Sequence, residues 1–418
     1  MPTIHVIGAG LAGLAASLSC AKAGRRVVVY EQGPAAGGRC RSYFDRGLGV
    51  RIDNGNHLLL SGNTATMAYL DEVGARDTLT GPGRASFAFM DVGTGERWRL
   101  EPGMGRLPWW VLRAARRVPG TRLRDYLALA TLRRRRGGRR GAASVASALG
   151  GTALYRRLIE PLAVSALNTR PEVARVALLA RVMAESMERG GAACVPSFPR
   201  IGLSESFVEP AIERLGKQGA TVHLARRVVA LRRDERRVVA LETAGGPVEL
   251  AAGDAVVVAT PSWIAADLVP GLTTPDAFES ILNVHFRTDE AGVGNDPFIG
   301  LVGGTAEWVF RKPGLASVTV SAANRMIDGS AEDLAQQVWP DVRAALALPE
   351  PMPPFRVVKE RRATFAATNE QEARRPRARD GLAENLALAG DWTATGLPAT
   401  IEGAIRSGRH AAAMLLQA

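Results

Sequence analysis

The stretch "TIHVIGAGLAGLAASLSCAKAGRRVVVYE", residues 3–31, decides the fold. Its apolar pattern predicts a short strand over 4–7, a helix rich in Ala and Leu that ends near Gly24, and a second strand over 27–30. A glycine-rich turn joins the first strand to the helix. This order of strand, glycine turn, helix and strand is typical of a βαβ unit that binds a dinucleotide.

Three glycines in that turn have separate tasks in such a unit. Gly8 permits the tight turn, Gly10 lets a pyrophosphate approach the backbone, and Gly13 lets the helix pack closely on the strand. The helix N-terminus offers free N–H groups and the positive end of its dipole to the phosphates. Glu31 ends the second strand and is placed to accept hydrogen bonds from a ribose hydroxyl. The sequence therefore predicts a dinucleotide site.

A second glycine motif indicates which dinucleotide is bound. In "GPAAGGRCRSYF", residues 33–44, the pair Gly37 and Gly38 gives a ligand further access to the backbone, and Arg39 adds a cation. This segment resembles the extended motif of the amine oxidase and phytoene desaturase flavoprotein superfamily, which implies FAD. Since no His or Cys lies in a context typical of flavinylation, we expect non-covalent FAD.

The C-terminal stretch "LALAGDWTATGLPATIEGAIRSGRHAAAMLLQA", residues 386–418, predicts a buried strand followed by a helix that starts near Pro398. Asp391 follows the strand and can bind ribityl or pyrophosphate groups. The helix N-terminus would face the flavin edge that gains negative charge on reduction, and its free N–H groups would stabilise that charge. Gly403 would let the ring approach closely.

The fold class expected from these patterns is α/β, with an FAD-binding Rossmann-like domain interleaved with a mixed α+β substrate domain. The first domain is expected from residues 1–62, 200–265 and 384–418, and the second from 63–199 and 266–383. Within the second domain, the segment up to Gly191 has a mostly helical pattern.

Further stretches narrow the resemblance. They are "IDNGNHLLL", "EPLAVSALNTRPEVA", "GLSESFVEPAIERL", "ILNVHF", "KERRATFAATNEQEARRP" and "LALAGDWTATGLPATIEGAIRSG". Together they resemble the squalene-associated FAD-dependent enzymes, the hydroxysqualene dehydroxylases, along the whole chain. The resemblance implies that reduced FAD and this chain convert hydroxysqualene to squalene. Hydride would pass from flavin N5 to an allylic cation after the hydroxyl leaves as water, in a dry apolar tunnel.

The motifs and the resemblance assign a set of residues to the site. The expected cofactor residues are Gly8, Gly10, Ala12, Gly13, Glu31, Gly38, Arg39, Val228, Gly390, Asp391, Ile401, Glu402, Gly403 and Ala404. The acid that protonates the departing hydroxyl stays open between His57, Glu160 and a relayed water molecule. A structural histidine is the alternative for His57. No metal site is expected, because the three cysteines have no ligand spacing.

Charge is concentrated in one segment. The chain of 418 residues carries a net charge of +12, and residues 104–140 contain twelve arginines with Asp125 as the one acid. Trp109 and Trp110 lie beside these arginines in "LPWWVLRAARRVPG". We expect interfacial helices here that dock on an anionic membrane, where a polyprenoid lipid substrate is collected. The alternative is a solvated, arginine-rich surface helix.

The composition predicts a cytoplasmic, peripherally membrane-associated protein with an unknown electron donor. The sequence has no apolar run long enough to span a membrane and no signal peptide pattern. Three other functions stay open at this stage. A carotenoid-type desaturase would use oxidised FAD, an amine oxidase would need an aromatic cage, and a nucleic-acid-binding protein would need a recognisable module that the sequence lacks.

Overall fold

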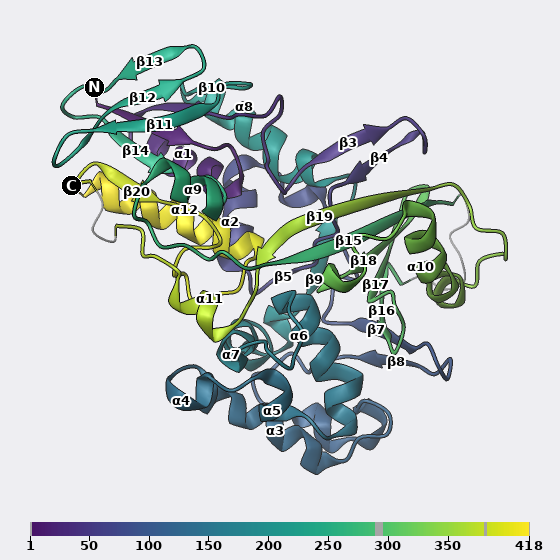
Figure 1. Cartoon of the computed structure of the whole chain (residues 1–418). Helices are drawn as coiled ribbons and strands as arrows, with labels where there is room; N and C mark the ends of the chain where they lie inside the picture. Colours follow the sequence, from purple (N-terminus) through teal and green to yellow (C-terminus); the bar gives the residue numbers. More distant parts are fainter. Residues whose placement is uncertain (1, 289–295, 380–382, 418) are drawn as a thin grey trace.

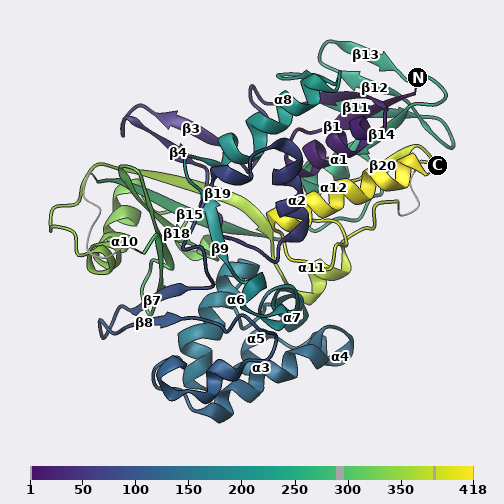
Figure 2. The same ribbon diagram turned by 180° about the vertical axis from the view of Figure 1, so that it is seen from behind.

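The computed structural model describes residues 2–288, 296–379 and 383–417. The two chain ends lie together beside a Rossmann-like sheet, and a helical module lies at the opposite end of the molecule (Figure 1). A large mixed sheet lies between them, and the view from behind shows the same order (Figure 2). The expected α/β fold class is confirmed.

The Rossmann-like sheet has five parallel strands in the order β10-β2-β1-β14-β20. They are β1 (Thr3–Ile7), β2 (Arg26–Tyr30), β10 (Thr221–His223), β14 (Ala255–Val258) and β20 (Leu386–Leu388). The residues of β1, β14 and β20 are all buried, and those of β2 are buried except Arg26, as is typical of parallel strands covered on both faces. The edge strand β10 has no buried residue.

Helices cover one face of this sheet, and a small sheet with one helix covers the other. The first face packs on α1 (Leu11–Lys22), α2 (Thr64–Val73), α8 (Glu209–Lys217) and α12 (Ile401–Leu416). The second packs on β11 (Val228–Arg233), β12 (Val238–Thr243), β13 (Gly246–Glu249) and α9 (Ser262–Leu268). A Cβ at Gly408 would lie 2.1 Å from the carbonyl oxygen of Ala12, so this glycine lets α12 cross α1 closely.

The mixed sheet has seven strands in the order β19-β15-β18-β17-β16-β7-β8. They are β7 (Phe87–Asp91), β8 (Arg97–Leu100), β15 (Phe278–Arg287), β16 (Phe298–Val302), β17 (Trp308–Lys312), β18 (Leu315–Val320) and β19 (Phe355–Phe365). One face packs on α10 (Ala331–Leu346). The other carries aromatic residues of β7, β16 and β17 against the helical module.

The helical module consists of short helices. They are α3 (Leu127–Thr131), α4 (Gly138–Gly141), α5 (Val145–Leu149), a π-helix η6 (Tyr155–Ile159) that continues into α6 (Glu160–Leu167), and α7 (Val176–Glu185). The remaining elements are β3 (Ser42–Asp45), β4 (Val50–Asp53), β5 (Leu59–Leu60), β6 (Leu79–Thr80), β9 (Pro196–Pro199) and α11 (Asn369–Ala373). Short 3-10 turns and a second π-helix, η9 (Ser204–Val208), join them.

The structure refines two expectations. The segment from 63 to 191 contains strands as well as helices, because β7 and β8 form one edge of the mixed sheet. The segment 104–140 does not form long helices. It folds as short turns, η2 (Trp109–Leu112), η3 (Ala114–Arg116), η4 (Leu123–Tyr126), α3, η5 (Leu132–Arg135) and α4. Proline and glycine within the segment interrupt longer helices. Among the described residues, no helix has the length and apolarity needed to cross a bilayer.

Candidate functional site

The turn between β1 and α1 has two glycines that the fold requires and one that it does not. Gly8 has φ +105°, and a Cβ there would lie 2.7 Å from the carbonyl oxygen of Ala259. A Cβ at Gly13 would lie 1.9 Å from the carbonyl oxygen of Gly8. A Cβ at Gly10 would meet no described atom within 4 Å. The open space over Gly10 is therefore available to a ligand at the N-terminus of α1.

Glu31 lies at the other end of this cradle. Its Oε2 accepts the N–H of Ala9 at 2.9 Å, and its Oε1 accepts the N–H of Gly33 at 2.8 Å. An ionised carboxylate has about four acceptor positions, so both oxygens can still accept from a ribose. The N–H of Arg226 donates to the carbonyl oxygen of Glu31 at 2.7 Å, which brings the start of β11 and Val228 to the same end.

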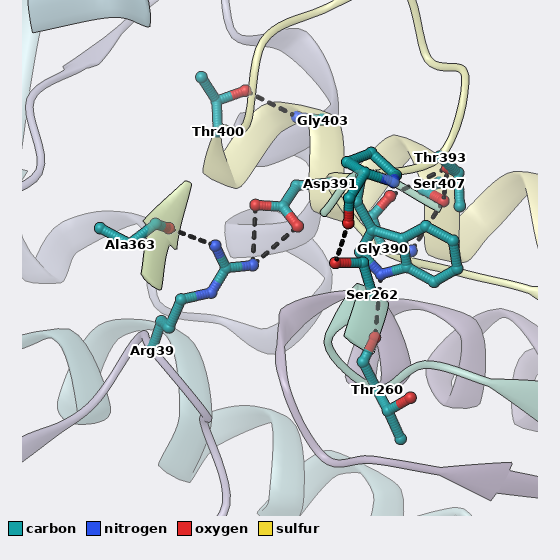
Figure 3. Close-up of polar contacts among 12 residues, drawn as sticks. Arg39, Thr260, Ser262, Ala363, Gly390, Asp391, Thr393, Thr400, Gly403 and Ser407 are labelled. Carbon is teal, nitrogen blue, oxygen red and sulfur yellow. Dashed lines mark hydrogen bonds and ion pairs between the residues drawn. The ribbon is translucent and has the colours of Figure 1, made fainter. Parts of the chain in front are cut away.

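Arg39 and Asp391 bind each other. Nη2 of Arg39 donates to both carboxylate oxygens of Asp391 at 2.7 and 2.8 Å, and Nη1 donates to the carbonyl oxygen of Ala363 on β19 (Figure 3). Burial lowers the pKa of Arg39, but the charge and hydrogen bond of Asp391 together with the charge of Glu360 raise it by more, so the guanidinium stays charged. The Arg39 side chain is 40% exposed, so it can still face a ligand. The pair fastens the second glycine turn to the end of β20.

Arg375 is a residue of this region that the motif analysis did not single out. Its side chain is fully buried, and Nη2 donates to the carbonyl oxygens of Asp391 and Thr393 and to Oγ1 of Thr395. The guanidinium also lies over the ring of Phe365, 4.8 Å from its centroid. Arg375 thereby holds the loop between β20 and α12 in place. Its signal in the sequence was the "NEQEARRP" stretch.

The N-terminus of α12 faces this loop. Thr400 is the N-cap, and its Oγ1 accepts the N–H of Gly403 at 3.1 Å (Figure 3). The helix begins at Ile401, slightly later than expected, and Ala404 closes the first turn onto the Thr400 carbonyl oxygen. Helix geometry leaves the N–H groups of Ile401 and Glu402 without intrahelical acceptors, so they can serve a ligand.

The side chain of Glu402 has another task. Its carboxylate accepts the N–H groups of Ala65 and Thr66 at the start of α2, at 3.0 and 2.8 Å. It also accepts from Nε of Arg406 at 2.7 Å. These partners occupy the buried carboxylate, so the cofactor-binding role expected for Glu402 would belong to its main-chain N–H group. The side chain joins α12 to α2, and only the main chain of Glu402 faces the cradle.

Thr260 and Trp392 complete the rear of the cradle next to Gly390. The buried Oγ1 of Thr260 has no hydrogen-bond partner within the described part of the chain. The indole N–H of Trp392 donates to the carbonyl oxygen of Thr260 at 2.9 Å, and Trp392 packs in the core under the sheet. Trp392 is therefore a packing residue, whereas Thr260 offers a free polar atom.

The loop from 53 to 57 crosses the mixed sheet next to Arg39. Nδ2 of Asn54 lies 3.4 Å from the carbonyl oxygen of Arg39. Successive residues of the loop contact successive strands: Asn54 donates to Glu360 on β19, Gly55 lies against Asn283 on β15, and Asn56 donates to Thr319 on β18. This polar ladder fixes the loop to the sheet beside the cradle.

A buried ion pair anchors the start of the loop. The Lys312 ammonium contacts the Asp53 carboxylate, and both side chains are less than a tenth exposed. Burial raises the pKa of Asp53, but Lys312 and two further hydrogen bonds lower it by more. His285 bonds to the Asp53 carbonyl oxygen and to Ser317, and burial lowers its pKa to about 4. Neutral His285 therefore helps to fix the loop to the mixed sheet and is not a candidate for the acid that protonates the hydroxyl.

The two candidate acids lie in different places. His57 is half-buried at the end of the loop, and burial lowers its pKa to about 4, so it is neutral near pH 7. A neutral imidazole is a weak proton donor, which argues against His57 as the acid. Burial and the charge of Glu172 raise the pKa of Glu160. Glu160 starts α6, while Asn168, about 12 Å along the helix, binds Thr364 beside the cradle. The structure does not bring Glu160 to the cradle.

These features fit a flavin dinucleotide. The space over Gly10 and the helix N-terminus behind it suit a pyrophosphate, and Glu31 suits a ribose. The free Oγ1 of Thr260 and the N–H groups at the start of α12 suit further polar atoms of the ligand. In the described residues, no cluster of three or more His, Cys, Asp or Glu side chains is arranged to hold a metal ion.

Comparison with known proteins defines the class first. Residues 11–416 match the family model of flavin containing amine oxidoreductases. An oxidoreductase from Methanosarcina mazei has the same fold, with a TM-score of 0.74, 16% identity and coverage of 98% of this chain and 99% of that one. A putrescine oxidase gives 0.71 at 17% identity with both chains fully covered. The chain therefore belongs to the flavin containing amine oxidoreductase family and is a flavin-dependent oxidoreductase.

The curated relatives then narrow the family. The hydroxysqualene dehydroxylase of Sinorhizobium fredii is 45% identical over 99% of this chain and 98% of the relative. Those of Zymomonas mobilis and Rhodopseudomonas palustris are 42% and 44% identical, each over 100% of this chain and 99% of the relative. A probable zeta-carotene desaturase of Synechococcus elongatus is 28% identical over 64% of this chain and 59% of that protein. The chain belongs to the hydroxysqualene dehydroxylase family, which confirms the resemblance found in the motifs.

Proposed function

We propose that this chain removes the hydroxyl group of hydroxysqualene and releases squalene, with a reduced flavin as the source of hydride. The observation that carries the proposal is the end-to-end match, at 42–45% identity, to three hydroxysqualene dehydroxylases. The cradle adds support, because its polar atoms and open backbone suit a flavin dinucleotide.

The chain has three tasks in this reaction. It positions the allylic C–OH group, keeps water away from the cation that forms when the hydroxyl leaves, and supplies the proton that leaves with it. The N–H groups at the N-terminus of α12 favour negative charge beside them. Because His57 is neutral and Glu160 lies along α6, a water molecule that relays a proton is the donor we favour.

The cofactor we propose is FAD held without a covalent bond. Cys40 follows Arg39 in the cradle, but burial raises the pKa of its thiol well above the ordinary value, so the thiolate needed for attachment is scarce. Acid precipitation is expected to release all yellow colour into the supernatant, and mass spectrometry should identify FAD there. Colour retained in the pellet would show a covalent link.

A single-turnover experiment tests the activity. Chemically reduced enzyme mixed anaerobically with hydroxysqualene is expected to give squalene and oxidised flavin, while oxidised enzyme gives neither. Deuterium carried at flavin N5 should appear at the former carbinol carbon. Squalene without deuterium at that carbon would exclude direct hydride transfer.

A desaturase is the second candidate, favoured by the partial match to a carotene desaturase. Such an enzyme would take hydride from its substrate with oxidised flavin. Anaerobic mixing of the oxidised enzyme with phytoene separates the two functions, since bleaching of the flavin would favour the desaturase.

We also propose that the protein docks peripherally on an anionic membrane, on the cytoplasmic side, through residues 104–140, the docking segment. Of the twelve exposed large hydrophobic side chains in the described chain, six lie in this segment. They are Met104, Leu107, Trp109, Leu112, Leu123 and Leu127, each between 45% and 68% exposed. Arginines flank them, and each surface arginine near anionic lipid contributes on the order of 1 kcal/mol.

Vesicle flotation tests the docking. The protein is expected to float with phosphatidylglycerol vesicles, less so in high salt, and not with phosphatidylcholine vesicles. The Trp109→Ala, Leu127→Ala double variant should bind less. The matched control is Leu224→Ala, Val229→Ala, two exposed apolar residues near β11. Equal binding by both double variants would exclude the docking segment as the docking element.

A further inference from the structure

A narrow hollow in the helical module has a wholly apolar lining. Leu129 and Leu132 of the docking segment form one wall. Leu158 and Leu162, on η6 and α6, form a second wall, and Met183 and Met187, in and after α7, form a third. Flexible leucine and methionine side chains adapt their shape to an apolar ligand. Such a lining gives a polar ligand nothing to bind and suits a hydrocarbon.

The outer wall of the hollow is also the exposed apolar surface. Leu127 and Leu129 are two residues apart on α3. Leu127 is 67% exposed to solvent, while Leu129 faces the hollow. In the stretch from Leu127 to Arg136, Leu132 is the one residue that is buried. Leu132 and the partly buried Ala128 and Leu129 pack this stretch against the core of the module. A short stretch that is held by a few side chains separates from α6 and α7 at a smaller cost than a long helix does.

The helix α6 connects the hollow to the cofactor cradle. Leu158 lies at the hollow, and Asn168, about 15 Å further along the helix, ends α6. Nδ2 of Asn168 donates to Oγ1 of Thr364 at 2.9 Å, next to Ala363, whose carbonyl oxygen binds Arg39. Both views of the molecule show α6 between the docking segment and the mixed sheet (Figures 1 and 2).

We propose that this hollow is a binding subsite for one isoprenoid arm of the substrate, and that the arm enters beside α3 from the membrane. The proposal rests on the function given above, because the substrate must be a long hydrocarbon with one hydroxyl. An arm of several prenyl units spans the distance from a reacting carbon at the cradle to the hollow. Since the hollow is narrow, α3 and η5 move outward when the arm enters.

Substitution of a lining residue tests the subsite by binding, without turnover. The ligand is squalane, a saturated and unreactive hydrocarbon of thirty carbons. The flavin-loaded protein in detergent is first given the fluorescent probe diphenylhexatriene, and squalane that binds in the hollow would displace the probe and lower its fluorescence. Leu162 is half-buried, so Leu162→Trp fills the hollow from its edge. We expect at least about tenfold weaker squalane binding. Val173→Trp, at an exposed site of the same module, is the matched control and should bind as the unchanged protein does.

Each outcome decides one question. Equal squalane binding by Leu162→Trp and the control would overturn the subsite and leave the hollow as a packing defect. Should Leu162→Trp fail to fold by circular dichroism, Met187→Trp at the half-buried rim takes its place with the same expectation. Squalane binding that depends on the hollow, in a protein that never converts hydroxysqualene, would support the subsite and exclude the proposed reaction.

Discussion

The cofactor cradle and the docking segment differ in how their residues are held. In the cradle, short hydrogen bonds fix the side chains: Glu31 is held by two backbone N–H groups, and Arg39 by the Asp391 carboxylate and a backbone carbonyl oxygen. The docking segment consists of short turns with twelve arginines and six exposed apolar side chains. A rigid cofactor needs fixed polar atoms at short distances, whereas a flexible hydrocarbon needs apolar surface and walls that can move.

The first prediction concerns Gly10, and it tests whether the open space in the cradle serves the cofactor. In Gly10→Ala the new methyl group meets no described atom within 4 Å, and φ of −73° suits alanine. We expect the protein to fold normally and to bind flavin at least about a hundredfold more weakly, a loss of about 2.7 kcal/mol. Titration of the flavin-free protein with FAD measures this.

Gly8→Ala is the contrast. Its methyl group would lie 2.7 Å from the Ala259 carbonyl oxygen, at a φ of +105°. This variant is therefore expected to lose folded protein as well as flavin. Normal flavin affinity in Gly10→Ala would contradict a phosphate position over that residue.

The second prediction tests whether any side chain of the docking segment is packed in the core of the protein. Trp110 is 6% exposed and packs edge to face against Tyr126, at 5.6 Å between ring centroids. Trp110→Ala would leave a cavity in the helical core and should lower the free energy of unfolding by about 3–5 kcal/mol. Urea unfolding followed by circular dichroism measures it. A loss below about 1 kcal/mol would mean that the segment has no packed anchor here.

The third prediction concerns Glu307, which directly precedes β17 of the mixed sheet. Its Oε2 accepts the N–H of Ser321 at 2.9 Å, and burial raises its pKa from 4.5 to about 7, against the lowering effects of Ser321 and Arg325. The folded state keeps this proton to higher pH than the unfolded state. Stability is therefore lost as pH rises from 4.5 to 7.

Glu307→Gln keeps an acceptor for Ser321 and removes the titration. From pH 5 to pH 8 the unchanged protein should lose up to about 3 kcal/mol of stability that the variant does not lose. Urea unfolding of both proteins at the two pH values measures the difference. The same pH dependence in both proteins would show that Glu307 titrates normally.

The sequence predicted the fold because the strongest constraints on it are local. The spacing of Gly8, Gly10 and Gly13 and the acid at Glu31 lie within one βαβ unit, so a short stretch contains the whole signal. The loop after β20 and the helix N-terminus at α12 are likewise adjacent in the chain. Rules of turn and helix geometry therefore sufficed for them.

The contacts that could not be predicted from the sequence join residues that are far apart along the chain. Arg39 binds Asp391 and Glu402 caps α2, partners that lie more than 330 residues apart in the chain. Arg375 is recognisable as a loop anchor only after the sheets are assembled. In the docking segment we expected interfacial helices without knowing their lengths, and Pro108 and Pro119 contribute to keeping them short.

The smallest expected effect belongs to Trp109, and it separates surface from core within one dipeptide. Trp109 is 68% exposed, while the adjacent Trp110 is buried. Trp109→Ala should change the free energy of unfolding by less than about 0.5 kcal/mol, because no packed contact is lost. Urea unfolding beside Trp110→Ala measures the contrast. A loss of about 2 kcal/mol or more in the free energy of unfolding would mean that Trp109 packs against the protein in solution and is not free to contact a membrane.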